Sequence, residues 1–167
     1  DGLITLPYFA GERTPINDPL ACGCLLGLTL AHTRAHLYRS ALESVAYSVN
    51  QQIRIMEAHD NVDIDQIFAV GGGVQNPHWM QIVADVTGKE INTPLVTIGA
   101  SFGDAMMAAT AVKYPGFEDF AALTKFIKPG CTFYPNPEAH EQYKAFQEVY
   151  DKLYPATVEL MHALAKQ

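Results

Sequence analysis

The sequence has 167 residues, of which 49% are hydrophobic and 17% are charged, enough for the core of one sizeable domain. Eleven Lys and Arg residues against 18 Asp and Glu residues give a net charge of −7 with no basic block, which argues against a nucleic-acid partner. Three cysteines without C-x-x-C spacing indicate neither a disulfide framework nor a zinc site.

No apolar run reaches the roughly 18 residues that a membrane-spanning helix needs, and the N-terminus lacks the basic-then-apolar form of a signal peptide. Together with the odd number of cysteines, this predicts a protein of the reducing cytoplasm without a membrane partner. The sequence begins with Asp1 rather than Met, so we expect a fragment of a longer chain.

Residues 1–30 mix short apolar runs with turn residues and are predicted to form loops and one strand. Glu12 and Arg13 form a charged pair in this region, and such a pair is expected to face solvent rather than a ligand cleft. Residues 33–59 repeat apolar side chains every three or four positions, which predicts a long helix with one buried face. The polar face of this helix is predicted to lie in solvent; its residues are Arg34, Arg39, Glu43, Asn50, Gln51 and Arg54.

His32 and His36 are four residues apart, a separation at which two imidazoles can share a metal on a helix. No glutamate motif or third ligand accompanies them, so we expect no metal at this pair.

A strand, a glycine loop and a helix then follow one another. Residues 67–70 form a short apolar, β-favouring run that stops at the three glycines 71–73. Asn76 in the capping position and Pro77 in the first turn start the helix, and Gly88 ends it. Glycines leave no side chain between the backbone and a ligand that lies on it, and the helix start offers unpaired N–H groups. A nucleotide would suit this surface.

Two common nucleotide loops do not fit this segment, because no Gly-Lys-Ser/Thr follows and the third glycine of G-x-G-x-x-G is missing. Glycines also occur where the backbone must simply turn tightly, and capping alone explains Asn76, so a structural interpretation of the segment stays open. For Trp79, the only tryptophan, packing in a core or interface is favoured over stacking on a base.

Residues 89–94 predict a short strand that ends at a proline. Residues 99–111 are rich in small side chains and predict a helix that can closely approach a neighbour or a ligand. Ser101 and Asp104 resemble a capping box at its start, and this role explains Asp104 better than one as a catalytic base.

The last part of the sequence is predicted to form a short helix near residues 118–126, a loop at residues 129–130 and a final helix that starts near Glu138. Aromatic residues of the final helix recur at helical spacing and are expected to pack rather than bind a ligand. Pro155 is expected to bend or interrupt this helix.

These motifs together resemble a known family. The run Gly23-Cys24-Leu25-Leu26-Gly27-Leu28, followed after seven residues by His36-Leu37-Tyr38-Arg39-Ser40-Ala41-Leu42-Glu43, is similar to the C-terminal signature of the FGGY carbohydrate kinases. The resemblance continues through residues 11–15, 71–88 and 99–109 and into the tyrosine-rich tail, so it covers nearly the whole chain. Xylulokinase-like members are the most similar.

The resemblance implies an α/β fold of the actin-like ATPase (ribonuclease H-like) type, a mixed sheet flanked by helices. It implies that residues 1–167 are the C-terminal nucleotide-binding domain of a two-domain kinase, which transfers the γ-phosphoryl group of MgATP to a hydroxyl of a sugar or polyol. Xylulose or ribulose are the favoured substrates, and the family implies a homodimer. The family's pattern places adenine contacts at Gly72 and Asn76, with Gly71 and Gly73 shaping the loop.

In the family, the catalytic aspartate and most sugar contacts belong to the N-terminal domain. No catalytic residue is therefore assigned here, and we expect this part alone to be inactive. Phosphoryl transfer depends mainly on positioning and electrostatic stabilisation, so two domains that close around both substrates make physical sense. The alternatives are a noncatalytic actin-like module that binds nucleotide or acts as a scaffold, and an interaction domain whose glycine turn is only structural.

Overall fold

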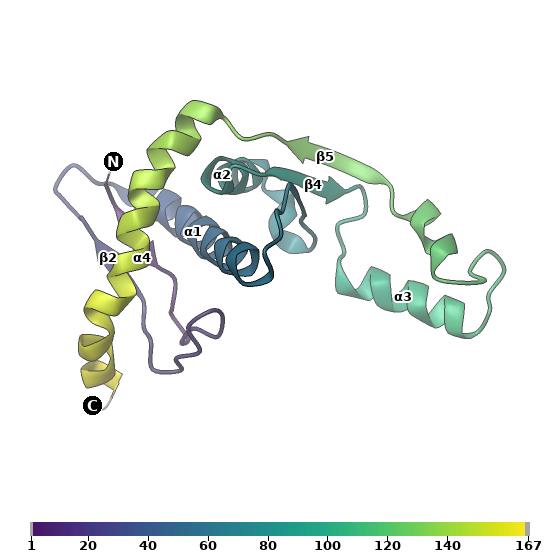
Figure 1. The fold of residues 1–167 in the computed structure, drawn as a ribbon, viewed down its shortest axis with the longest axis horizontal. Helices are drawn as coiled ribbons and strands as arrows, with labels where there is room; N and C mark the ends of the chain where they lie inside the picture. Colours follow the sequence, from purple (N-terminus) through teal and green to yellow (C-terminus); the bar gives the residue numbers. More distant parts are fainter. Residues whose placement is uncertain (1, 166–167) are drawn as a thin grey trace.

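The computed structural model describes residues 2–165, which form a mixed α/β arrangement (Figure 1). A three-stranded sheet has the order β3-β4-β5, with β3 parallel and β5 antiparallel to the central strand β4, and β1 pairs with β2 in a separate antiparallel ribbon. In chain order the elements are β1 (Ile4–Leu6), β2 (Cys24–Leu26), α1 (Arg34–Asp60), β3 (Gln66–Phe68), the 3-10 helix η1 (Gly72–Gln75), α2 (Pro77–Thr87), β4 (Glu90–Pro94), α3 (Ala100–Ala111), the 3-10 helix η2 (Ala121–Phe126), β5 (Pro129–Phe133) and α4 (Pro137–Ala165).

The core lies where α2 packs between the sheet and α1, while β1 and α4 close it from the other side. Ile91 in the central strand is completely buried, and so are Leu6 in β1 and Ala84 in α2. By contrast, α3 buries no residue fully and extends from the sheet away from α1 and α4 (Figure 1). The α3 segment therefore stands beside the core rather than within it.

Two features of the strands differ from the sequence prediction. Residues 1–30 contain two strands rather than one, because β2 follows a long turn and pairs back onto β1. Residues 129–130, predicted as a loop, begin strand β5. A proline is tolerated as the first residue of a strand, and a side chain at Gly130 would lie 2.8 Å from the Pro94 backbone, so glycine allows this close pairing.

The predicted capping box of α3 is wrong. The helix begins at Ala100, and its capping residue Gly99 makes no side-chain hydrogen bond. Gly99 turns the chain into the helix with a left-handed φ of 67°, so Ser101 already lies inside the first turn and Asp104 beyond the capping position. The short helix predicted near residues 118–126 is the 3-10 helix η2.

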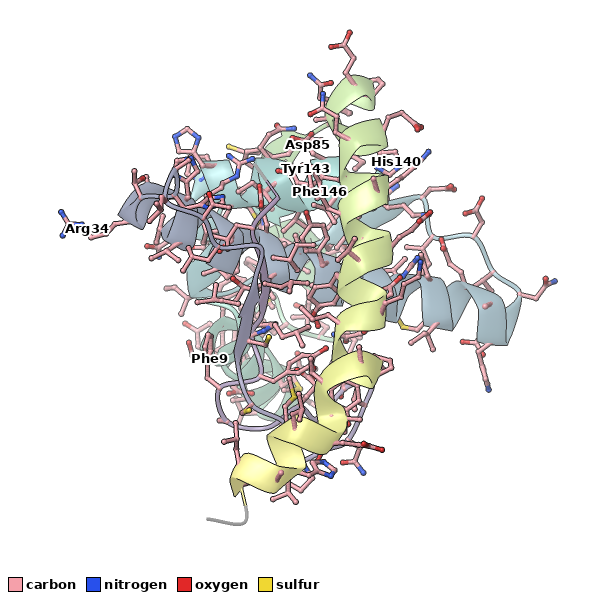
Figure 2. The ribbon with its side chains drawn as sticks, turned by 90° about the vertical axis from the view of Figure 1, so that its left-hand side faces the viewer. Phe9, Arg34, Asp85, His140, Tyr143 and Phe146 are labelled. Carbon is pink, nitrogen blue, oxygen red and sulfur yellow. The ribbon has the colours of Figure 1, made fainter. Side chains whose placement is uncertain are left out.

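Pro155 was expected to bend or interrupt the last helix; it does not interrupt it, because α4 continues through Pro155 to Ala165. Buried residues on both sides of the proline, Tyr150, Leu153 and Met161, hold the two halves against the body, which offsets the lost backbone hydrogen bond. The expected packing of the aromatic residues is confirmed. Figure 2 shows Tyr143 and Phe146 on the side of α4 that faces α1, whereas Arg34 points away from the body.

The polar face of α1, predicted to lie in solvent, lies partly against α4. Asn50 donates a hydrogen bond to Gln147 (3.0 Å), and both Gln51 (3.2 Å) and Arg54 (2.5 Å) donate to Asp151. Arg34, Arg39 and Arg54 are exposed as predicted. The prediction failed for Glu43, Asn50 and Gln51, which are half-buried, because α4, about 100 residues further along the chain, supplies polar partners that helical periodicity does not reveal.

The end of α4 is anchored to the loop that follows β1. The Asp18 carboxylate accepts hydrogen bonds from the Tyr154 hydroxyl (2.8 Å), His162 Nε2 (2.7 Å) and the Leu20 backbone N–H (2.9 Å). The hydrogen bond from His162 is the main cause that lowers the pKa of Asp18. Asp18 therefore stabilises the fold above the pKa of about 3.9 of an unfolded aspartate, and this contribution is lost as the pH falls through the lower folded pKa.

We accordingly expect Asp18→Asn to destabilise the protein at neutral pH, with the difference from the wild type shrinking below about pH 4. Urea unfolding of both proteins at neutral and acidic pH measures this difference. Asp65→Asn, at an exposed position, is the control and should show no such trend. A difference that stays constant with pH would contradict the role of Asp18.

Candidate functional site

The glycine segment joins strand β3 to helix α2. β3 ends at Phe68, and the Ala69 N–H still donates to the Asn92 carbonyl of β4 (2.8 Å). The predicted strand is thus present but ends earlier than residue 70. Gly71 then takes a φ of 98°, a conformation that favours glycine, and one 3-10 turn occupies the place of the predicted loop.

The three glycines have different surroundings. A Cβ atom built on Gly71 or Gly72 would meet no atom within 4 Å, whereas one on Gly73 would lie 2.9 Å from the Trp79 ring. The backbone of Gly71 and Gly72 is therefore open to a ligand. Gly73 is explained by its close packing on the indole, which is a structural role.

Asn76 and Gly88 bound helix α2 as predicted. Asn76 has an extended backbone conformation, and its Oδ1 accepts a hydrogen bond from the Trp79 backbone N–H (3.2 Å). Gly88 ends the helix with φ 68°, and its N–H donates to the Ala84 carbonyl (2.8 Å). Among the described residues, the amide nitrogen Nδ2 of Asn76 has no partner, so it can donate to a ligand beside the glycines.

Trp79 holds the glycine segment against α1. Its indole Nε1 donates to the Leu42 carbonyl (3.1 Å), and its ring lies beneath Gly73. These contacts agree with the predicted packing role rather than with stacking on a base.

A second loop lies beside the first. A Cβ on Gly99, the residue that caps α3, would lie 3.4 Å from the N and Cα atoms of Gly71. Next to this contact is an apolar cavity of about 190 Å³. Its lining includes Phe68, Val70, Phe102, Met106 and Ile127. The small residues of the 99–111 segment indicated a close approach to a neighbour, but the sequence did not identify this cavity.

The described residues offer no preformed metal site. Within residues 2–165, no group of three or more His, Cys, Asp or Glu side chains could hold a metal ion. Over the same residues, no helix is long and apolar enough to cross a membrane.

Comparison with known proteins gives the context for this geometry. Residues 1–112 match the family model of the C-terminal domain of the FGGY family of carbohydrate kinases. The chain is 33% identical over 161 residues to a xylulose kinase from Staphylococcus epidermidis, covering 96% of this chain and 32% of that protein. It is 38% identical over 113 residues to glycerol kinase 2 from Saccharolobus solfataricus, covering 68% of this chain and 23% of that protein.

Among solved structures, a xylulose kinase from Rhodospirillum rubrum matches with a TM-score of 0.75 and 32% identity, covering 97% of this chain and 32% of that chain. These similarities confirm the predicted actin-like α/β fold with a mixed sheet flanked by helices. The chain spans about a third of the length of the curated relatives that it matches.

Proposed function

Because the chain belongs to the FGGY family of carbohydrate kinases, we propose that it is the C-terminal, ATP-binding domain of a two-domain kinase that phosphorylates a ketopentose. The observation that carries this proposal is the open space above Gly71 and Gly72. A planar purine can lie directly on this backbone, with the Asn76 amide donating to it from the helix start. Gly71, Gly72, Gly73 and Asn76 are thus the proposed nucleotide-binding residues.

In this proposal the domain holds and positions the nucleotide while the rest of the kinase supplies the sugar contacts and the catalytic base. ATP provides the phosphoryl group that passes to a sugar hydroxyl. Mg²⁺ would arrive with the ATP phosphates, since the described residues lack a metal cage and Mg²⁺ in kinase sites is held largely by phosphates and water. Closure of two domains would exclude water from the transfer.

The choice of sugar rests on the extent of the similarities. The match to the named xylulose kinase extends over 96% of the chain, whereas that to the named glycerol kinase covers 68%. This supports a ketopentose such as xylulose, with ribulose as the related substrate. We also propose that the whole kinase is a homodimer, and sedimentation of the natural-length protein would test this oligomeric state. We place it in the cytoplasm.

The natural-length protein is expected to transfer phosphate from ATP to D-xylulose with a kcat/KM at least about tenfold higher than for glycerol, because a pocket built for the hydroxyls of one substrate discriminates against another. Coupled measurement of ADP release with xylulose, ribulose and glycerol gives these values. Tight ATP binding without transfer to any sugar would contradict the proposal and favour a noncatalytic nucleotide-binding module.

A further inference from the structure

Trp79 contacts both parts of the proposed nucleotide site. Its ring lies against the glycine turn, where a Cβ atom on Gly73 would be 2.9 Å from the ring atom Cζ3. Its backbone N–H donates to Oδ1 of Asn76 (3.2 Å), so the Nδ2 group of the same amide is the one left for a ligand. One residue therefore touches the backbone proposed to carry the purine and also the amide proposed to donate to it.

The indole is itself fixed to helix α1. Its Nε1 donates to the Leu42 carbonyl (3.1 Å), and the half-buried side chain packs against the edge of the core. A tryptophan side chain has only two rotatable bonds, so the contact with Gly73 and this hydrogen bond together hold the ring in one orientation. The glycine turn thus rests on α1 through Trp79.

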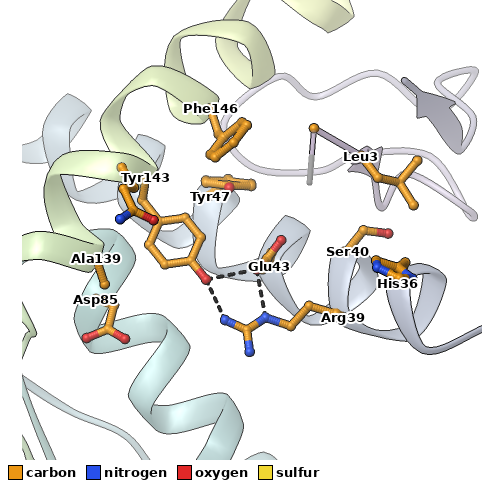
Figure 3. A pocket seen from close by; sticks show the side chains of 12 residues that line it. Leu3, His36, Arg39, Ser40, Glu43, Tyr47, Asp85, Ala139, Tyr143 and Phe146 are labelled. Atoms are coloured by element: carbon orange, nitrogen blue, oxygen red, sulfur yellow. Dashed lines mark hydrogen bonds and ion pairs between the residues drawn. The ribbon is translucent and has the colours of Figure 1, made fainter. Parts of the chain in front are cut away.

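The turn of α1 that carries Leu42 is also held by α4. Arg39 donates from Nε to Glu43 Oε1 (2.7 Å) and from a terminal nitrogen to the Tyr143 hydroxyl (2.7 Å), and that hydroxyl donates to the same Glu43 oxygen (2.8 Å; Figure 3). Burial raises the pKa of Tyr143 to about 12, so the hydroxyl keeps its proton at physiological pH. These three side chains line a polar cavity of about 410 Å³ between α1 and α4. Because Glu43 directly follows Leu42, their bonds restrain the carbonyl to which the indole is tied.

We propose that Trp79 is a positioning residue for the nucleotide: it sets the place of the glycine turn relative to α1 and the direction of the Asn76 amide, so that a purine meets both at once. This inference rests on the proposed function and extends it to a residue that need not touch ATP. Glycines give the backbone wide conformational freedom, so without this support the ligand would have to order the turn, which lowers affinity.

Gly73→Ala and Trp79→Phe test this role in the natural-length protein, with the Kd for ATP measured by isothermal titration. A methyl group on Gly73 would face the indole, and its nearest contact would be Cζ3, a ring atom for which phenylalanine has no counterpart. Gly73→Ala is therefore expected to displace the turn and raise the Kd at least about tenfold. Trp79→Phe, which loses the bond to Leu42, is expected to raise it at least about threefold.

The double variant Gly73→Ala/Trp79→Phe separates positioning from stability. Because phenylalanine makes room for the methyl group, the double variant should bind ATP within about threefold of Trp79→Phe alone and more tightly than Gly73→Ala. A tryptophan that served only stability would show this rescue in thermal unfolding but not in the Kd for ATP. Val86→Ala, a buried change seven residues further along α2, is the control: it should lower thermal stability and leave the Kd unchanged.

An unchanged Kd in Trp79→Phe would overturn the role of Trp79. A double variant that binds ATP no better than Gly73→Ala would also overturn it, because the methyl group would then act on the ligand directly. Loss of ATP affinity in Val86→Ala would do the same, since any loss of stability would then suffice. Failure of the proposed nucleotide site is distinguishable, because in that case Gly72→Val also binds ATP as the wild type does.

Discussion

Gly72→Val is expected to weaken ATP binding by the natural-length protein at least about 100-fold, or about 2.7 kcal/mol, while leaving the fold intact. Gly72 has no left-handed φ, and a Cβ there would meet no protein atom within 4 Å, so the valine fits the free protein. Its two methyl groups would instead occupy the space proposed for the purine. The loss should therefore appear in nucleotide affinity and not in stability.

Isothermal titration with ATP, alongside thermal unfolding of the free protein, separates these two effects. Gln66→Val is a suitable control because it adds the same side chain at an exposed position of β3, away from the glycines. It should leave ATP affinity unchanged. If Gly72→Val bound ATP as tightly as the wild type, the open backbone would not be the nucleotide site and the glycine turn would be structural.

Gly27→Ala is expected to lower the free energy of unfolding by at least about 3 kcal/mol. Gly27 has a φ of 89°, and a Cβ there would lie 2.1 Å from the Gly2 carbonyl oxygen. That carbonyl cannot easily withdraw, because Leu3 is buried and β1, which starts at Ile4, pairs with β2 directly before Gly27. This glycine of the signature run is thus explained by backbone packing rather than by ligand contact.

Urea unfolding measures the effect, with Gly103→Ala as the comparison. A Cβ at Gly103 in α3 would meet no atom within 4 Å, and alanine is favoured over glycine in helices by about 1 kcal/mol, so this variant should be as stable as the wild type or more so. Equal stability of Gly27→Ala and the wild type would show that the β1–β2 ribbon can shift to accept a methyl group.

Local signals in the sequence predicted much of the fold. The long helix was expected at residues 33–59 and is observed at Arg34–Asp60, because its apolar period extends over many turns. The start and end of α2 were correctly placed by Asn76, Pro77 and Gly88, since a helix cap depends on a few neighbouring residues.

Failures occurred where partners distant in sequence decide the structure. The start of β5 looked like a turn because Pro129 and Gly130 usually mark one, and only the pairing with β4 makes it a strand. Likewise, Asn50 and Gln51 could be identified as polar but not as partners of α4.

The candidate site shows the same division between local and distant determinants. The glycine turn and its capping asparagine are contiguous in the chain and could be predicted from spacing alone. The adjoining apolar cavity could not, because Phe68, Phe102 and Ile127 come from three separate segments that only the folded backbone brings together. The polar cavity beside α4 depends in the same way on contacts between Arg39 and Tyr143, which are 104 residues apart.

The position of Trp79 gives this protein a built-in optical probe. The indole is the single one in the sequence, and it lies directly under the glycine turn while its nitrogen is tied to the Leu42 carbonyl. Any molecule that settles on that turn changes the polarity around the ring from above, whereas the cavity beside α4 is lined by tyrosines instead. Fluorescence emission excited at the tryptophan band can therefore follow events at one surface without interference from the other.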